Sequence, residues 1–299
     1  MPRDRAVNLA MLAVAAAIYG GIFPVNRMAA EAGWPALGFA LAQALLGGVA
    51  LGGYVLARRR RLLPSMRHAA VYLLLGALAM GLPTALLTRA AQHVPASTLT
   101  LVLALSPVFT LLFAILVKLE RFRVRALGAV LLGLAGVGLI AAPGSDGLAE
   151  GALPWFLLAL LAPIMFAASN VVAGWLRPPA TASTTMAAGI LLGAVCVLAV
   201  VMLPTGAPVL PAVLDGRAAW PVAWAAAIDA ATFALFFEIV RRAGPTFFSL
   251  FNYLAIGAGI AWSMAVFAEV PPPVFWLALA VMLAAVYMAV GGRPAQLEA

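Results

Sequence analysis

The chain is a succession of apolar segments separated by short polar or turn-like stretches. A helix needs about 20 apolar residues to cross the hydrocarbon core of a bilayer. Ten segments approach that length: 7–28, 35–57, 68–90, 96–118, 124–142, 152–175, 183–203, 218–241, 246–268 and 273–291. Apolar residues are continuous within them rather than alternating, as residues 126–142 illustrate. The pattern therefore predicts helices rather than the strands of a transmembrane barrel.

The ten segments divide into two groups of five, residues 7–142 and residues 152–291. Because five is odd, two related halves must enter the membrane from opposite sides. Inverted copies of one bundle that meet at the membrane midplane are an architecture of secondary transporters. The sequence thus predicts an all-α integral membrane protein of ten transmembrane helices in two inverted five-helix repeats, one in each group.

Composition excludes a soluble protein, which needs a charged exterior. Hydrophobic residues make up 65% of the chain and charged residues 9%, and the mean hydropathy is +1.09. The lipid bilayer is therefore an expected partner. The net charge of +8 does not indicate nucleic acid, because the cations fall between the segments, where membrane topology explains them. We expect the first segment to be retained, since its apolar run continues past a signal-like start to Phe23.

The basic residues predict the orientation of the chain. With the N-terminus inside, only Arg27, Arg89 and Arg217 of the 18 Lys and Arg residues fall on the outer side, and 15 fall on the inner side. Cytoplasmic loops carry such an excess of Lys and Arg. The count predicts a multi-pass protein of the inner membrane, with both termini in the cytoplasm.

Internal similarity between the halves is weak, but its pattern is regular. A shift of 149 positions brings Glu120 onto Glu269, each at the end of a fourth segment, where we expect them to cap or fasten loops. Small residues recur as Gly48-x-x-x-Gly52, as Gly189-x-x-x-Gly193 and four times in segment 124–142. Small residues let helices approach closely in lipid. A tight bundle without a repeat would show the same glycines, so the repeat rests mainly on the topology.

Specific motifs connect the chain with a family. The stretch Ser106-Pro107-Val108-Phe109, with Lys118-Leu119-Glu120-Arg121 and Leu127-Gly128-Ala129 after it, resembles the EamA domain of the drug/metabolite transporter superfamily. The first segment, with Tyr19-Gly20-Gly21-Ile22-Phe23-Pro24-Val25-Asn26, is similar to its opening helix. The resemblance implies a ten-helix carrier whose central site lies among helices 1, 3, 4, 6, 8 and 9. Within the superfamily the chain is most similar to YddG-type exporters of aromatic and other neutral amino acids.

Asp229 is the most informative polar residue, because it lies near the middle of segment 218–241. Ionisable residues inside a membrane are costly and usually mark ion or substrate pathways. Asp229 can take up a proton during turnover, bind a substrate ammonium, or serve as a structural residue bonded to a neighbouring helix. We interpret it as the first candidate for the transport pathway and for proton coupling.

Other polar residues within segments are further candidates for the substrate pathway. Arg89 near the outer mouth can attract a carboxylate or extend to lipid headgroups. The remaining candidates provide hydroxyl, amide, phenol and indole groups: Thr84, Thr88, Ser106, Asn26, Asn170, Asn252, Tyr253 and Trp262. Three prolines, Pro24, Pro83 and Pro107, remove backbone donors within segments and are hinge or kink candidates, or simply tolerated kinks.

These features favour a secondary transporter that moves small metabolites by alternating access. The resemblance implies aromatic and other neutral amino acids as the substrates and outward transport. A carrier of another metabolite, such as a drug, nucleotide precursor or sugar derivative, is the alternative. A membrane enzyme would need a nucleophile–base pair, a carboxylate metal site or a His/Asp set, and none is visible in the sequence. A channel would need a filter motif or charged rings. We expect no catalytic residues, no metal and no cofactor, and a carrier that works as a monomer.

Overall fold

The computed structural model describes residues 2–117, 124–142, 148–176, 178, 181–204, 206, 208–211, 215–248 and 251–290. In this part of the chain all regular secondary structure is helical. The first half contains α1 (Pro2–Gly20), α2 (Ile22–Glu31), α3 (Ala36–Ala57), α4 (Met66–Gly76), η1 (Ala77–Gly81), α5 (Leu82–Ala90), α6 (Ala96–Val102), η2 (Leu103–Leu105), α7 (Ser106–Leu116) and α8 (Val124–Ala141). The second half contains α9 (Leu153–Ala159), α10 (Leu161–Leu176), α11 (Ser183–Met202), α12 (Gly216–Phe248), α13 (Phe251–Phe267) and α14 (Pro273–Val290).

Each apolar segment predicted from the sequence lies on one of these helices or on a short series of them. Seven helical stretches among the described residues are long and apolar enough to cross a membrane, and three shorter apolar helices accompany them: Leu127–Ala141, Leu254–Phe267 and Pro273–Ala285. The predicted boundary near residue 241 is wrong, because α12 continues to Phe248. The proline at position 245 removes one backbone hydrogen bond, which can kink a helix without ending it.

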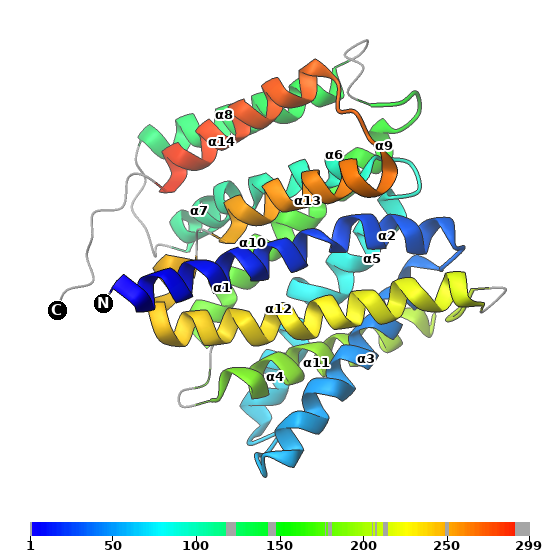
Figure 1. Cartoon of the computed structure of the whole chain (residues 1–299), viewed down its shortest axis with the longest axis vertical. Helices are drawn as coiled ribbons and strands as arrows, with labels where there is room; N and C mark the ends of the chain where they lie inside the picture. Colours follow the sequence, from blue (N-terminus) through cyan, green and yellow to red (C-terminus); the bar gives the residue numbers. More distant parts are fainter. Residues whose placement is uncertain are drawn as a thin grey trace.

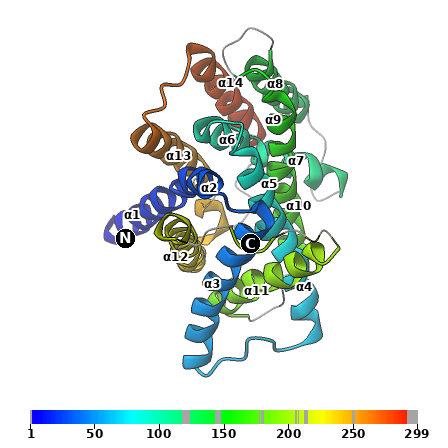
Figure 2. The ribbon, with the colours of Figure 1, turned by 90° about the vertical axis from the view of Figure 1, so that its right-hand side faces the viewer.

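The helices are arranged in adjoining groups (Figures 1 and 2). The pair α8 and α14 lies at one edge, and α3, α4 and α11 lie together at the opposite edge. Between these edges α1 packs against both α12 and α13, while α10 packs against α5 and α7. The contacts of α8 with α14, of α11 with α3 and α4, of α1 with α12 and α13, and of α10 with α5 and α7 all join an element of the first half to an element of the second.

Glycines set the closest contacts between the halves. A Cβ atom added to Gly193 of α11 would collide with the backbone carbonyl of Tyr72 in α4, and one added to Gly189 would collide with the Tyr72 ring. On the other edge, a Cβ at Gly136 of α8 would lie 2.6 Å from Cγ of Met282 in α14. The prediction that small residues allow close helix packing is confirmed at these positions.

The outside of the bundle is itself apolar. Large aliphatic side chains lie exposed on α3, α8, α11 and α14, among them Val49, Leu131, Val200 and Leu277. A soluble protein rarely exposes large apolar patches. The exposed apolar surface therefore fits a bilayer as the surrounding solvent.

Each predicted proline kink coincides with an irregularity in its helix. Gly21 separates α1 from α2, three residues before Pro24. The π-helical turn η1 ends two residues before Pro83, and the 3₁₀ turn η2 ends two residues before Pro107. Proline cannot donate to the carbonyl four residues earlier, so the helix changes its hydrogen bonding there.

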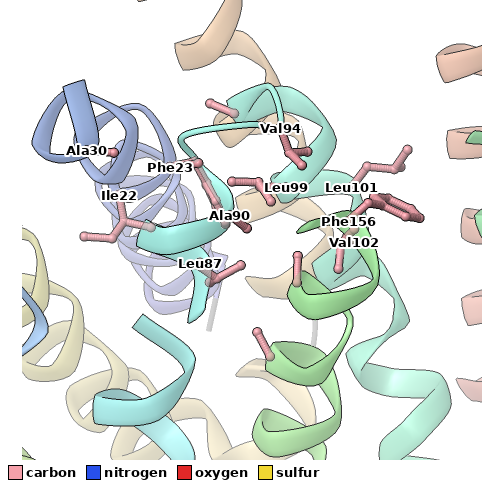
Figure 3. Close-up of a cluster of buried hydrophobic side chains, with 14 of the residues drawn as sticks. Ile22, Phe23, Ala30, Leu87, Ala90, Val94, Leu99, Leu101, Val102 and Phe156 are labelled. Atoms are coloured by element: carbon pink, nitrogen blue, oxygen red, sulfur yellow. The ribbon is translucent and has the colours of Figure 1, made fainter. Parts of the chain in front are cut away.

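A buried apolar cluster fills one end of the bundle, where α2 ends and α6 and α9 begin. We call this the far end. The cluster includes Ala30 of α2, Ala90 of α5, Val94 of the turn after α5, Leu99 of α6 and Phe156 of α9 (Figure 3). The Trp34 indole also donates a hydrogen bond of 2.7 Å to the Ala218 carbonyl at the start of α12. These contacts close the far end with residues from both halves.

Candidate functional site

A cavity of about 200 Å³ lies among helices of both halves. Residues of α1, α2, α3, η1 and α5 line it from the first half, and residues of α10, α12 and α13 from the second. Its apolar wall is rich in aromatic rings, with Phe23, Phe166, Phe233 and Phe251 among them. Ligand sites typically combine such an apolar wall with a few placed polar groups.

The centre of the polar wall is a buried pair of a carboxyl and an amide. Asp229 of α12 is 4% exposed, and Gln43 of α3 is 1% exposed. The Gln43 Nε2 group donates a hydrogen bond of 2.6 Å to Asp229 Oδ2. The amide stabilises the carboxylate and joins an element of the first half to one of the second.

Three further oxygen atoms of the cavity wall are buried without a hydrogen-bond partner among the described residues. They are Asn26 Oδ1, Gln43 Oε1 and Thr232 Oγ1. A buried polar atom left unpaired costs roughly 1–3 kcal/mol. In this conformation these atoms are also shielded from water, so each lacks a hydrogen bond that a donor could supply.

Four of the predicted pathway residues meet in this cavity: Asn26, Thr84, Asn170 and Asp229. Asn170 donates a hydrogen bond of 3.3 Å to Thr110 Oγ1 of α7. These four come from α2, α5, α10 and α12, so the bundle brings together residues that are far apart in the sequence.

Other candidates lie outside the cavity wall. Arg89 is exposed, donates to Gln92 Oε1 and stacks over the Trp155 ring. Trp262 donates its indole hydrogen to the Ala17 carbonyl at 2.8 Å, which fastens α13 to α1. The polar atoms of both side chains are thus engaged in structural contacts.

Of the remaining candidates, some lie outside the cavity wall, and the others have side chains outside the described residues. Thr88 is fully buried in α5 but is not part of the cavity wall. Ser106 is half-buried, and its carbonyl accepts a hydrogen bond from Thr110. The side chains of Pro107, Asn252 and Tyr253 lie outside the described residues.

Gln43, Ser169 and Thr232 line the cavity but are absent from the predicted set. Gln43 had a detectable signal, because it is a lone amide within the apolar segment 35–57. The resemblance implied a supporting role for that helix, whereas α3 contributes Gln43 to the cavity wall. No residue of α6 or α7 is among the described lining residues, although the resemblance placed helix 4 at the site.

An ionic cluster lies at the far end, separate from the cavity. Arg27 Nη1 donates to Glu269 Oε1 at 2.6 Å, and the Arg27 guanidinium also lies 4.1 Å from the centre of the Phe267 ring. The Glu269 carboxylate accepts the backbone N–H groups of Ala96 and Ser97, both at 3.1 Å. The prediction that Glu269 caps a helix is confirmed, because these N–H groups begin α6. Glu120, its counterpart in the sequence, lies outside the described residues.

Within the described residues no group of three or more His, Cys, Asp or Glu side chains is placed to hold a metal ion. Apolar helices, an apolar exterior and a mainly apolar cavity with a few polar groups between the halves fit a membrane transport protein. The model of the EamA-like transporter family matches residues 7–142. Residues 7–142 are thus similar to the EamA-like transporter family of the drug/metabolite transporter superfamily.

Relatives that are similar over most of the chain are named as inner membrane transporters. The uncharacterized inner membrane transporter YedA of Escherichia coli strain K12 is 27% identical over 282 residues, which cover 92% of this chain and 88% of YedA. YedA of Escherichia coli O157:H7 is similar to the same extent. A solved crystal structure shares the fold with a TM-score of 0.60 and 21% identity, covering 93% of this chain and 95% of that one. These similarities and the apolar helices support a multi-pass inner-membrane transporter.

Proposed function

We propose that the chain is an alternating-access carrier that binds a small metabolite in the cavity between its two halves. The observation that carries this proposal is the buried Asp229–Gln43 pair, which joins the halves inside a cavity. A carboxylate at this depth is costly and usually marks a pathway. Rocking of one half against the other would expose the cavity to either side of the membrane in turn.

The pattern of helix contacts supports ten spans in two repeats, residues 7–142 and 152–291. Each of the ten segments has an equivalent segment five places along in the other half. For several contacts between the halves, replacing both partners by their equivalents again gives an observed contact. The contact of α1 with α13 exchanges with that of α10 with α7, and the contact of α4 with α11 exchanges with that of α12 with α3. The contacts of α3 with α11 and of α8 with α14 exchange with themselves. A two-fold relation between the halves would produce this pattern.

Matching helix breaks also support the repeat. The first helix of each half is interrupted three residues before a proline, at Gly21 before Pro24 and at Leu160 before Pro163. We propose that these breaks, together with the irregular turns before Pro83 and Pro107, act as hinges. They allow the outer and inner parts of a helix to move separately during transport.

The orientation follows from the charge asymmetry, with both termini in the cytoplasm and the far end facing outward. A reporter protein that is active only in the cytoplasm should be active when fused after Ala299. The measurement is reporter activity in intact cells, with the same reporter fused in the loop after Glu31 as the control expected to be inactive. Activity after Glu31 and none after Ala299 would invert the proposed topology.

Aromatic and other neutral amino acids are the substrates that the resemblance favours, and outward transport rests on the same resemblance. The cavity, at about 200 Å³, is smaller than the roughly 300–1,000 Å³ of pockets for drug-sized ligands, which favours a metabolite over a drug. Its four phenylalanines supply an apolar surface for a side chain. Asp229 is also the group that would exchange a proton if transport is proton-coupled.

Counterflow in vesicles tests the carrier. Preloading vesicles with unlabelled substrate should accelerate uptake of the labelled compound, because the loaded site returns faster than the empty one in a carrier. The panel includes aromatic and neutral amino acids, amines and nucleotide precursors, with and without a pH gradient. Acceleration by a panel member is expected. Uptake that is insensitive to preloading for every transported compound would indicate a pore and contradict the proposal.

A further inference from the structure

The polar wall of the cavity is rich in hydrogen-bond acceptors and contains one carboxyl group among the described lining residues. Asp229 is the charged residue of this wall, and no Lys, Arg or His side chain lines the cavity in the described part of the chain. Two amide oxygens, Asn26 Oδ1 and Gln43 Oε1, are buried there without a partner among the described residues. Asn26 is 2% exposed and Gln43 is 1% exposed, so bulk water does not solvate them freely.

The orientation of the Gln43 amide follows from its partner. An ionised carboxylate accepts hydrogen bonds and cannot donate them, so the NH₂ group of Gln43 must face Asp229. The Gln43 carbonyl oxygen is bonded to the same carbon atom as that nitrogen and therefore lies close to the carboxylate. Asp229 and Gln43 Oε1 thus present two neighbouring acceptors to the cavity.

Several potential donors of the wall are already used within the protein. The Asn170 amide donates to Thr110 Oγ1, and the Ser169 hydroxyl donates to the Phe166 carbonyl at 2.8 Å. The Gln43 amide nitrogen is bonded to Asp229. The Thr232 hydroxyl can still donate a hydrogen bond, but an anionic ligand group would also face the Asp229 carboxyl group and carbonyl oxygens, with no cation to balance it among the described lining residues.

We propose that the cavity recognises a protonated primary amine on an aromatic or aliphatic body that lacks a carboxylate. An ammonium group has three donors and no acceptor. Asp229, Gln43 Oε1 and Asn26 Oδ1 are the acceptors that match it, and Thr232 Oγ1 is available beside them. The body of the ligand packs against Phe23, Phe166 and Phe233. The inference rests on the proposed carrier function, and it replaces the amino acids that the resemblance favours with the corresponding amines.

Binding of three matched probes to the purified full-length protein tests this assignment. Phenethylamine carries the amine alone, phenylalanine carries both charges, and 3-phenylpropanoate carries the carboxylate alone. By isothermal titration calorimetry, phenethylamine should bind at least about tenfold more tightly than phenylalanine, and 3-phenylpropanoate should not bind measurably. Equal or tighter binding of phenylalanine, binding of 3-phenylpropanoate, or no binding of phenethylamine to the folded wild type would each overturn the inference.

Variants of Asp229 test whether this residue binds the ammonium group. Asp229→Asn should weaken phenethylamine binding about ten- to a hundredfold, because a charge-assisted contact becomes a neutral one. Asp229→Glu should restore part of the loss. Asp215→Asn is the matched control at the start of the same helix, since Asp215 caps the Ala218 N–H and asparagine caps equally well. Unchanged phenethylamine binding in a folded Asp229→Asn protein would overturn the role of Asp229, and the comparison of the three probes needs no variant.

Failure of the amine site and failure of the carrier proposal can be distinguished by experiment. Counterflow of amino acids without binding of phenethylamine would overturn the amine site and leave the carrier standing. Binding of phenethylamine with the stated selectivity, but uptake insensitive to preloading, would support the site and contradict the carrier.

Discussion

Replacing Glu269 with glutamine is expected to open the far end of the bundle. Its carboxylate joins Arg27 of the first half to the end of α13 and caps the first two N–H groups of α6. Hydrogen bonds to charged groups contribute roughly 1.5–3 kcal/mol. Glutamine keeps one acceptor oxygen but loses the charge, so the closed state loses at least one such interaction. The population with an open far end should rise at least about tenfold, since 1.4 kcal/mol corresponds to a factor of ten.

Thiol labelling in right-side-out vesicles measures this opening. Ser169→Cys places a thiol in the cavity, and Cys196→Ala removes the exposed native cysteine. Glu269→Gln should raise the rate of labelling by an impermeant maleimide from outside at least about tenfold. Glu31→Gln is the control, because Glu31 bonds the same arginine but is 55% exposed and lies on the same helix. Such surface pairs contribute about 0–1 kcal/mol. Equal labelling of Glu269→Gln and the parent protein would show that this cluster does not hold the far end closed.

Replacing Gly193 with alanine should severely reduce the stability of the bundle. The added Cβ would meet the backbone of Tyr72 and Leu73 in α4, and backbone atoms cannot move aside as a flexible side chain can. Overpacking a tight contact typically lowers the stability of the folded state by about 1–3 kcal/mol. We expect a collision with the backbone to cost about 3 kcal/mol or more. Because this contact joins α11 to α4, the two halves should separate more easily along that edge.

The midpoint of thermal unfolding and the yield of monodisperse protein in detergent measure the effect. Both should fall markedly for Gly193→Ala. Gly53→Ala is the matched control, because Gly53 is an exposed helical glycine whose added Cβ would have nothing within 4 Å. Alanine is favoured over glycine in a helix by about 1 kcal/mol, so this variant should be as stable as the parent or more so. Equal unfolding midpoints for the two variants would contradict the inferred close packing of α4 and α11.

The sequence by itself determined the class of fold. An apolar stretch of about twenty residues is a local property of the sequence, and it is sufficient for a helix to cross a bilayer. Helix positions and the irregular turns before Pro24 and Pro83 followed from local patterns in the same way. A fastening role for Glu269 was expected from its place at the end of a segment, but the helix that it caps lies far away in the sequence. The boundary of α12 did not, because whether a helix continues past a proline depends on what packs around it.

Only the tertiary structure decided which polar groups meet. Gln43 and Asp229 are 186 positions apart, and Arg27 and Glu269 are 242 positions apart. Their contacts depend on which face each helix turns toward its neighbours, and close backbone contacts such as Gly193 with Tyr72 set those faces. A polar residue in an apolar segment thus signals that it needs a partner, but the packing of the two halves supplies the partner. This is why Asp229 and the lone amide of Gln43 were detectable in the sequence, while their pairing and the acceptor-rich cavity around them were not.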